Sequence, residues 1–267
     1  MKVVLTIGGS DSGGGAGIQA VLKTFEAHEV FATTAITALT AQNTVSVSDI
    51  HQPKSEFVSA QIKAVLDDFE VSAIKIGMLF SKEIIKTVYK ELENYKGPLV
   101  LDTVFVSRTN SLLLRENAVE ELKRLFEKAT IITPNMYEAY RLFGYRTGCS
   151  ESLEQLRSQP CPVLVKNHMT KKDDKEYSVD ILYTKNSKHV FETPFSHQHS
   201  THGTGCSYSA AIAANLALGY GLHESIARAK RFVYFAIDSA PSIGKGVGPI
   251  GHKEGYRKMK EYYGESK

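Results

Sequence analysis

The alternation of short aliphatic runs with longer amphipathic segments constrains the fold of this 267-residue chain more than any other feature. Parallel strands joined by crossover helices produce this pattern, because each crossover must return across a face of the sheet. The expected strands are residues 3–7, 33–39, 73–76, 99–102, 130–133 and 162–166, with a hairpin from 178–183 and 189–193. The expected helices are 57–69, 82–95, 117–128 and 151–159, and one that begins near Ile18. We therefore expect a single doubly wound α/β domain over residues 1–267.

Composition restricts the class of protein. A hydrophobic fraction of 42% and a formal net charge of +3 are typical of a globular chain and do not indicate nucleic-acid binding. The three cysteines are widely spaced, which argues against a disulfide framework. Residues 3–7 are too short for the apolar core of a signal peptide, so we expect a cytoplasmic protein. The uncharged stretch from Gly203 to Leu222 is rich in alanine, and we expect a buried helix there rather than a membrane span.

The motif Thr201-His202-Gly203-Thr204-Gly205-Cys206 stands at the start of that uncharged stretch. Glycines let backbone N–H groups approach an anion without obstruction by a Cβ atom, and a helix start adds unpaired donors and the positive end of its dipole. The motif therefore predicts a phosphate site. A zinc site is the alternative, because His197 and His199 lie close to His202, but no carboxylate or cysteine completes a ligand set.

Polar residues also follow other expected strands. Six glycines lie among residues 8–17, but their spacing matches neither the dinucleotide-binding fingerprint nor the P-loop. Asp102 follows another strand, and Asn135 and Glu138 lie three residues apart at an expected helix start, where they share a face. Such oxygen ligands suit Mg²⁺. The alternative is that Asn135 caps the helix and Glu138 is its capping-box partner.

Seven blocks of the chain, taken in order, resemble those of the hydroxymethylpyrimidine/phosphomethylpyrimidine kinases of the ribokinase superfamily. They are residues 8–20, 41–44, 75–78, 101–104, 132–135, 201–206 and 244–249. The resemblance implies a ribokinase-like three-layer α/β/α fold with a mostly parallel central sheet and helices on both faces. It also implies an ATP- and Mg²⁺-dependent homodimeric enzyme of thiamine biosynthesis. Such an enzyme phosphorylates 4-amino-5-hydroxymethyl-2-methylpyrimidine and then its monophosphate, without a nucleic-acid or membrane partner.

The same resemblance implies a role for each matching residue. The backbone of Gly203, Thr204 and Gly205 would form an anion hole, and Cys206 would accept the hydroxymethyl proton. A helix N-terminus lowers a thiol pKa, which would favour that role over that of a small buried thiol. Gln42 would read the aminopyrimidine edge through its amide. The remaining residues implied are Gly9, Met78 and Val104 at the ring, Lys166, Lys245 and Asn135 at the nucleotide, and Glu138 and Asp102 at the metal.

The chain departs from the family pattern at three places, and the sequence does not decide between the kinase function and two rival functions. Val21 stands where the family usually has an acid, and residues 107–110 and 167–169 differ from the usual loops. Met78 and Val104 are equally consistent with ordinary core packing, and the lysines with surface positions. The rival functions are a pyridoxine or pyridoxal kinase and a non-catalytic relative that binds a pyrimidine or a nucleotide.

Overall fold

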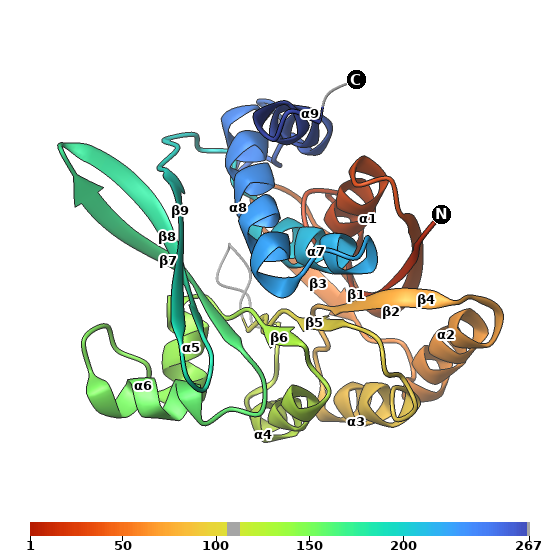
Figure 1. The fold of residues 1–267 in the computed structure, drawn as a ribbon. Helices are drawn as coiled ribbons and strands as arrows, with labels where there is room; N and C mark the ends of the chain where they lie inside the picture. The colour runs from red at the N-terminus through yellow and green to blue at the C-terminus, as the bar shows by residue number, and fades with distance from the viewer. Residues whose placement is uncertain (106–112, 266–267) are drawn as a thin grey trace.

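The computed structural model describes residues 1–105 and 113–265, and the strands in those ranges form one nine-stranded sheet (Figure 1). The strands are β1 (Val3–Asp11), β2 (Phe31–Gln42), β3 (Val47–His51), β4 (Val71–Ile76), β5 (Leu99–Leu101), β6 (Ile131–Ile132), β7 (Val163–Lys172), β8 (Lys175–Tyr183) and β9 (Lys188–Pro194). Their order is β3-β2-β1-β4-β5-β6-β7-β8-β9. From β2 to β7 neighbouring strands run parallel, whereas β3, β8 and β9 pair antiparallel.

Helices cover both faces of this sheet. They are α1 (Gly17–Ala27), α2 (Ser55–Asp68), α3 (Lys82–Glu91), α4 (Val119–Lys123), α5 (Met136–Phe143), α6 (Ser150–Arg157), α7 (Thr204–Ala217), α8 (Leu222–Asp238) and α9 (His252–Tyr262). In Figure 1, α2, α3 and α4 lie on one side, and α1, α7, α8 and α9 lie on the other. The predicted three-layer α/β/α fold is confirmed.

Alternation along the strands produces two separate cores. In β4, Ile74 and Ile76 join the core beneath α2 and α3, whereas Ala73 joins the core beneath α7. Successive side chains of a strand point to opposite faces, so Lys75 lies on the same face as Ala73. Small alanines of α7 are completely buried against this face, which brings the start of α7 close to the carboxyl ends of the strands.

Several boundaries differ from the prediction. The first strand continues to Asp11, so Gly8 and Gly9 lie inside the strand and not in a loop. The edge strand β3 was not predicted, because its alternation is short and mostly exposed. The expected helix over 117–128 is only the short α4, flanked by 3₁₀ turns. The uncharged stretch forms α7, which is buried as predicted and ends at Ala217. No helix in the described residues is long and apolar enough to cross a membrane.

Candidate active site

A cavity of about 300 Å³ lies at the carboxyl ends of the parallel strands, beside the first turn of α7. The candidate residues that line it are Gly9, Gln42, Met78, Val104, Asp102, Asn135, Glu138, Lys166, Gly203, Thr204, Gly205 and Cys206. The remaining candidate, Lys245, is exposed and lies outside this lining. Residues far apart in sequence meet here because parallel strands end at one edge of the sheet.

The start of α7 forms an anion cradle. Gly203 is its N-cap with φ of 80°, and no side chain caps the helix. A Cβ atom on Gly203 would collide with the carbonyl oxygen of Gly15, so both conformation and packing require glycine here. In a helix, the first N–H groups, including those of Gly205 and Cys206, have no intrahelical acceptor. These donors border the cavity and can bind a phosphate oxygen.

Three buried charges lie beneath this helix start, at the ends of neighbouring strands. Asp102 Oδ1 is 3.0 Å from Lys166 Nζ, and Asp102 Oδ2 is 3.9 Å from Lys75 Nζ. Burial alone would raise the pKa of Asp102, but the two lysines hold it below its ordinary value. The carboxylate also accepts from the hydroxyls of Thr133 and Ser209. Because protein donors occupy its oxygens, Asp102 is suited to anchoring the lysines, and this arrangement does not favour the implied role of a direct metal ligand.

Asn135 and Glu138 form the capping box at the start of α5. The Asn135 side chain accepts from the Glu138 N–H at 2.9 Å, and Glu138 Oε2 accepts from the Asn135 N–H at 2.9 Å. Glu138 is nevertheless buried and lines the cavity. Burial raises the pKa of Glu138 to about 7, against the opposing charge of Lys166. The two interpretations of this pair are therefore compatible, since a capping carboxyl can also face a ligand.

The donor set fits a magnesium ion held through Glu138. Glu138 Oε2 also accepts from the Thr103 hydroxyl, but no described residue donates to Oε1. A hydrated cation would interact with this oxygen. Its positive charge would stabilise the ionised carboxylate, which burial disfavours. The described residues contain no group of three or more histidine, cysteine, aspartate or glutamate side chains that could hold a metal. The zinc interpretation of His197, His199 and His202 is therefore wrong, whereas Mg²⁺ needs few protein ligands because it keeps water and binds substrate phosphates.

The predicted effect of the helix start on Cys206 is wrong. Burial raises the pKa of the Cys206 thiol, and the nearby charges of Lys75 and Lys166 only partly oppose this. A thiolate in a low-dielectric site loses its hydration, and that loss outweighs the help from helix donors. Burial therefore favours the protonated form of the Cys206 thiol.

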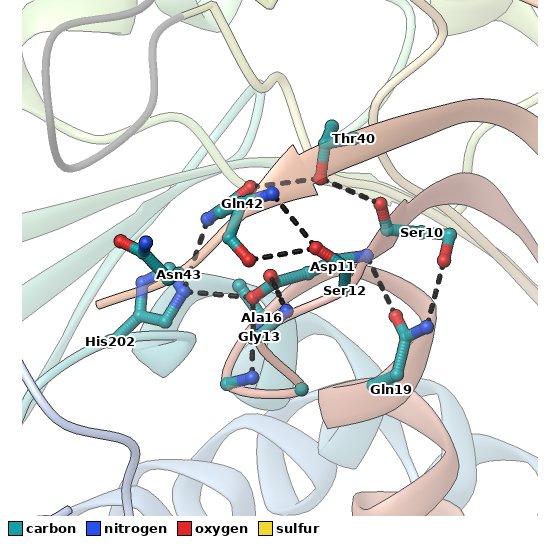
Figure 2. Close-up of polar contacts among 12 residues, drawn as sticks. Ser10, Asp11, Ser12, Gly13, Ala16, Gln19, Thr40, Gln42, Asn43 and His202 are labelled. Atoms are coloured by element: carbon teal, nitrogen blue, oxygen red, sulfur yellow. Dashed lines mark hydrogen bonds and ion pairs between the residues drawn. The ribbon is translucent and has the colours of Figure 1, made fainter. Parts of the chain in front are cut away.

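A hydrogen-bond network orients Gln42, which lines the same cavity, as Figure 2 shows. His202 Nε2 contacts both an Asp11 carboxylate oxygen at 2.9 Å and the Gln42 amide at 3.2 Å. The Thr40 hydroxyl donates to the Ser10 carbonyl oxygen at 2.9 Å and contacts the same amide at 3.1 Å. In the structure the amide nitrogen of Gln42 lies beside His202 Nε2 and the amide oxygen lies beside the Thr40 hydroxyl. Because His202 Nε2–H donates to the carboxylate, it cannot accept from the amide nitrogen, so we assign the Gln42 amide with its oxygen and nitrogen exchanged. In that assignment the amide oxygen accepts from His202, and the amide nitrogen donates to Thr40, whose own proton is already used.

Asp11 holds this network in place through a tight turn. Its carboxylate accepts from the backbone N–H groups of Gly13, Gly15 and Ala16. Burial alone would raise the pKa of Asp11, but the hydrogen bonds from His202 and from the turn keep it below its ordinary value. The glycine-rich segment after β1 thus creates a carboxylate site that fixes His202, and His202 in turn fixes the amide of Gln42.

Part of the cavity wall is apolar. Met78 packs with Leu113 and the half-buried Val104, and all three line the cavity. A Cβ atom on Gly9 would lie 2.8 Å from Met78 Sδ, so glycine allows the close approach of β1. Val21, the departure in α1, is buried and lines the same cavity. The departure at 107–110 lies outside the described residues.

Sequence reasoning missed three residues of this cavity: Asp11, His202 as an orienting group, and Lys75. A signal for Lys75 was present, because a lysine inside an otherwise apolar strand of a parallel sheet is costly to bury. No sequence signal joined Asp11 to His202, since 191 positions separate them.

A cavity that combines an anion cradle, buried lysines and an apolar slot suits phosphoryl transfer to a small acceptor, the chemistry of a small-molecule kinase. Similarity to known proteins agrees with this class. A profile of phosphomethylpyrimidine kinases matches residues 11–251. The chain belongs to the phosphomethylpyrimidine kinase family, whose members are phosphotransferases.

Individual relatives support this membership. The chain is 42% identical over 260 residues to the hydroxymethylpyrimidine/phosphomethylpyrimidine kinase of Haemophilus influenzae, covering 94% of this chain and 97% of that protein. It is 44% identical over 257 residues to a thiamine biosynthesis bifunctional protein of Geobacter sulfurreducens, covering 93% of this chain but spanning only 52% of that longer protein. The crystal structure of an ADP complex of Bacillus subtilis pyridoxal kinase is similar with a TM-score of 0.84 and 32% identity, covering 95% and 98% of the two chains.

Proposed function

We propose that this chain transfers the γ-phosphoryl group of ATP first to 4-amino-5-hydroxymethyl-2-methylpyrimidine and then to its monophosphate. One observation carries the proposal: the anion cradle of α7, the oriented Gln42 amide and the apolar side chains of Met78 and Val104 line the same cavity. An aminopyrimidine needs both an acceptor and a donor along one edge, and a primary amide offers both.

The first phosphorylation follows from this arrangement. Gln42 and the apolar wall hold the ring, so that the hydroxymethyl group faces Cys206. The N–H groups of Gly205 and Cys206 stabilise the negative charge of the transferring phosphoryl group, and Lys166 adds a charge beside the cradle. Mg²⁺ near Glu138 and Asn135 would neutralise charge on the phosphates of ATP. Cys206 accepts the hydroxyl proton as a thiolate, the form that burial disfavours and that the charges of Lys75 and Lys166 partly restore, once the acceptor oxygen has begun to bond to phosphorus.

The second phosphorylation needs no base, because a phosphate oxygen of the monophosphate is already a nucleophile. That oxygen forms a bond to the γ-phosphorus of ATP while the bond to ADP breaks. The same cradle serves both steps. We further expect the enzyme to be a cytoplasmic homodimer, as the family resemblance implies, and Lys245 to approach the nucleotide.

A coupled assay of ADP release tests the proposal. The wild-type chain should consume ATP with the hydroxymethylpyrimidine, and Gly205→Asp should lower kcat/KM at least about 100-fold by placing a carboxylate in the cradle. Gly205→Ala is the matched control: the nearest atom to its Cβ, Lys166 Nζ, would be 3.7 Å away. The alanine variant should fold, so it separates an effect on the cradle from an effect on stability. An active Gly205→Asp variant would contradict the assignment of the cradle.

Substrate choice separates this proposal from its rivals. Gln42→Met should raise KM for the aminopyrimidine about 10- to 100-fold, the effect of two lost hydrogen bonds. Competition between pyridoxal and the hydroxymethylpyrimidine tests the nearest rival function, that of a pyridoxal kinase. The similarity to a pyridoxal kinase structure is the reason to choose pyridoxal as the competing substrate. Preferential turnover of pyridoxal would replace our assignment. Absence of ATP consumption with every pyrimidine and pyridoxine analogue would instead favour a non-catalytic binding protein.

A further inference from the structure

Lys75 is a buried cation whose ammonium group has no hydrogen-bond acceptor among the described residues. Its side chain is only 2% exposed, yet its ammonium group donates no hydrogen bond to any described residue. The nearest carboxylate oxygen, Asp102 Oδ2, is 3.9 Å away, which is an ion pair beyond hydrogen-bond length. An ammonium group carries three donors, and leaving them unpaired away from water is costly. Within the described part of the chain, Lys75 therefore has an ion-pair partner in Asp102 but no hydrogen-bond acceptor.

The ammonium group points toward the cavity. A Cβ atom on Gly77 would lie 2.6 Å from Lys75 Nζ, so the lysine extends past the end of β4 into space that only glycine leaves open. Lys75 and Gly77 both line the cavity. The charge of Lys75 also acts on the Cys206 thiol, which places the ammonium group near the start of α7.

A second unpartnered group lies beside it. Thr6 of β1 is the register partner of Lys75, so their side chains share the face of the sheet that carries α7. The Thr6 hydroxyl is buried and has no hydrogen-bond partner within the part of the chain that the structure describes. Thr6 also lines the cavity. An ammonium group with free donors and a hydroxyl without a partner among the described residues make a site for an anionic oxygen.

The position of this pair distinguishes it from the cradle. Lys166 lies at the cradle itself, close to Gly205, and is held by Asp102 at 3.0 Å. Lys75 lies further along the sheet, on β4, whose next residues lead to Met78 in the apolar wall. The pair therefore lies in the same cavity as the cradle, on β1 and on the neighbouring strand that leads to the apolar side chain of Met78. In the second step, this cavity must accommodate the phosphate of the acceptor.

We propose that Lys75 and Thr6 form a subsite for the phosphate of the phosphomethylpyrimidine, and that this subsite allows the enzyme to use a phosphorylated acceptor after an unphosphorylated one. The inference rests on the proposed function. The ammonium group of Lys75 donates to the phosphate oxygens that do not attack, and the Thr6 hydroxyl donates to one of them. The hydroxymethyl substrate has no such oxygens, so it gains less from the pair.

The test is the ratio of kcat/KM for the monophosphate to kcat/KM for the hydroxymethylpyrimidine, each measured separately by ADP release with ATP saturating. Lys75→Met should lower this ratio about 10- to 100-fold, as expected for a lost charge-assisted hydrogen bond. Thr6→Val should lower it about threefold or more, because valine keeps the shape of threonine. Thr24→Val is the control, since the Thr24 hydroxyl is buried but donates to the Ala20 carbonyl in α1; its ratio should not change.

The outcomes separate the two proposals. If the wild-type chain consumes no ATP with either acceptor, the proposed function fails and this inference fails with it. If the wild-type chain is active but Lys75→Met and Thr6→Val lower both specificity constants equally, only the inference is overturned. Should Lys75→Met not fold, Thr6→Val decides the question, supported by calorimetric binding of the monophosphate: an affinity equal to that of wild type would overturn the subsite.

Discussion

Glu138→Gln replaces a buried carboxyl of the cavity by an uncharged group of the same shape. The amide oxygen can still accept from the Asn135 N–H and the Thr103 hydroxyl, so the capping box survives. Burial raises the pKa of Glu138 from 4.5 to about 7. A difference of roughly 2.5 pKa units, at about 1.4 kcal/mol per unit, corresponds to about 3 kcal/mol of lost stability when the carboxyl ionises.

The sign follows from the protons bound in each state. Between pH 4.5 and about 7 the folded protein keeps a proton on Glu138 that the unfolded chain releases. The free energy of unfolding therefore falls as pH rises through this window, and the loss is complete above pH 7. The glutamine variant cannot lose this proton. It should match the wild type near pH 4 and exceed its stability by about 3 kcal/mol at pH 8.

Urea denaturation of both proteins from pH 4 to pH 8.5 measures this difference. Glu93→Gln is the control, because Glu93 is exposed and its replacement should leave the pH profile parallel to that of wild type. Parallel profiles for Glu138→Gln would refute the reasoning. Adding MgCl₂ with ATP at pH 8 should stabilise the wild type more than the Glu138→Gln variant, because only the carboxylate provides a negative charge to bind the ion. The kcat of the variant should also be lower than that of the wild type.

Variants at three further positions test the cavity and its surroundings. Cys206→Ala should lower kcat/KM of the first step at least about 100-fold and that of the second step much less, because only a hydroxyl acceptor needs a base; equal losses in the two ADP-release assays would contradict this. His202→Leu should raise KM for the hydroxymethylpyrimidine about tenfold, with a smaller change in kcat, because Gln42 loses its orienting donor; an unchanged KM would argue against the network. Asn167 has φ of 70°, so Asn167→Val should cost about 1–2 kcal/mol in urea denaturation while Asn167→Gly stays within about 0.5 kcal/mol of wild type; equal stabilities would contradict the assignment of strain.

Much of the fold was predictable because it rests on local patterns. The parallel strands appeared as β-branched runs, since burial on both faces excludes polar residues, and the hairpin of β8 and β9 was marked by its turn residues. The edge strand β3 was not predictable in the same way, because an exposed strand pairs through its backbone and needs few apolar side chains. The extension of β1 to Asp11 was hidden by glycines that normally indicate a loop.

The candidate site was predictable wherever one short motif carried the chemistry. The glycines of residues 203–206 stand before a predicted helix, and this pattern predicted the anion cradle. The spacing of Asn135 and Glu138 predicted that their side chains share a helix face, in either of their two possible roles. The structure changed what several of these residues do. The thiol of Cys206 was expected to be acidified by its helix, yet burial raises its pKa, because desolvation depends on neighbours that the motif does not contain.

The sequence by itself determined the class of fold, the anion cradle and the membership of a kinase family, because backbone propensity, glycine placement and motif order are properties of adjacent residues. Only the tertiary structure decided which charges meet. It paired Asp102 with Lys166 and joined Asp11 to His202. Within the described residues, it left the Lys75 ammonium group without a hydrogen-bond acceptor and the Thr6 hydroxyl without a partner. Electrostatic roles depend on distance and burial in three dimensions, and neither quantity can be read from positions along the chain.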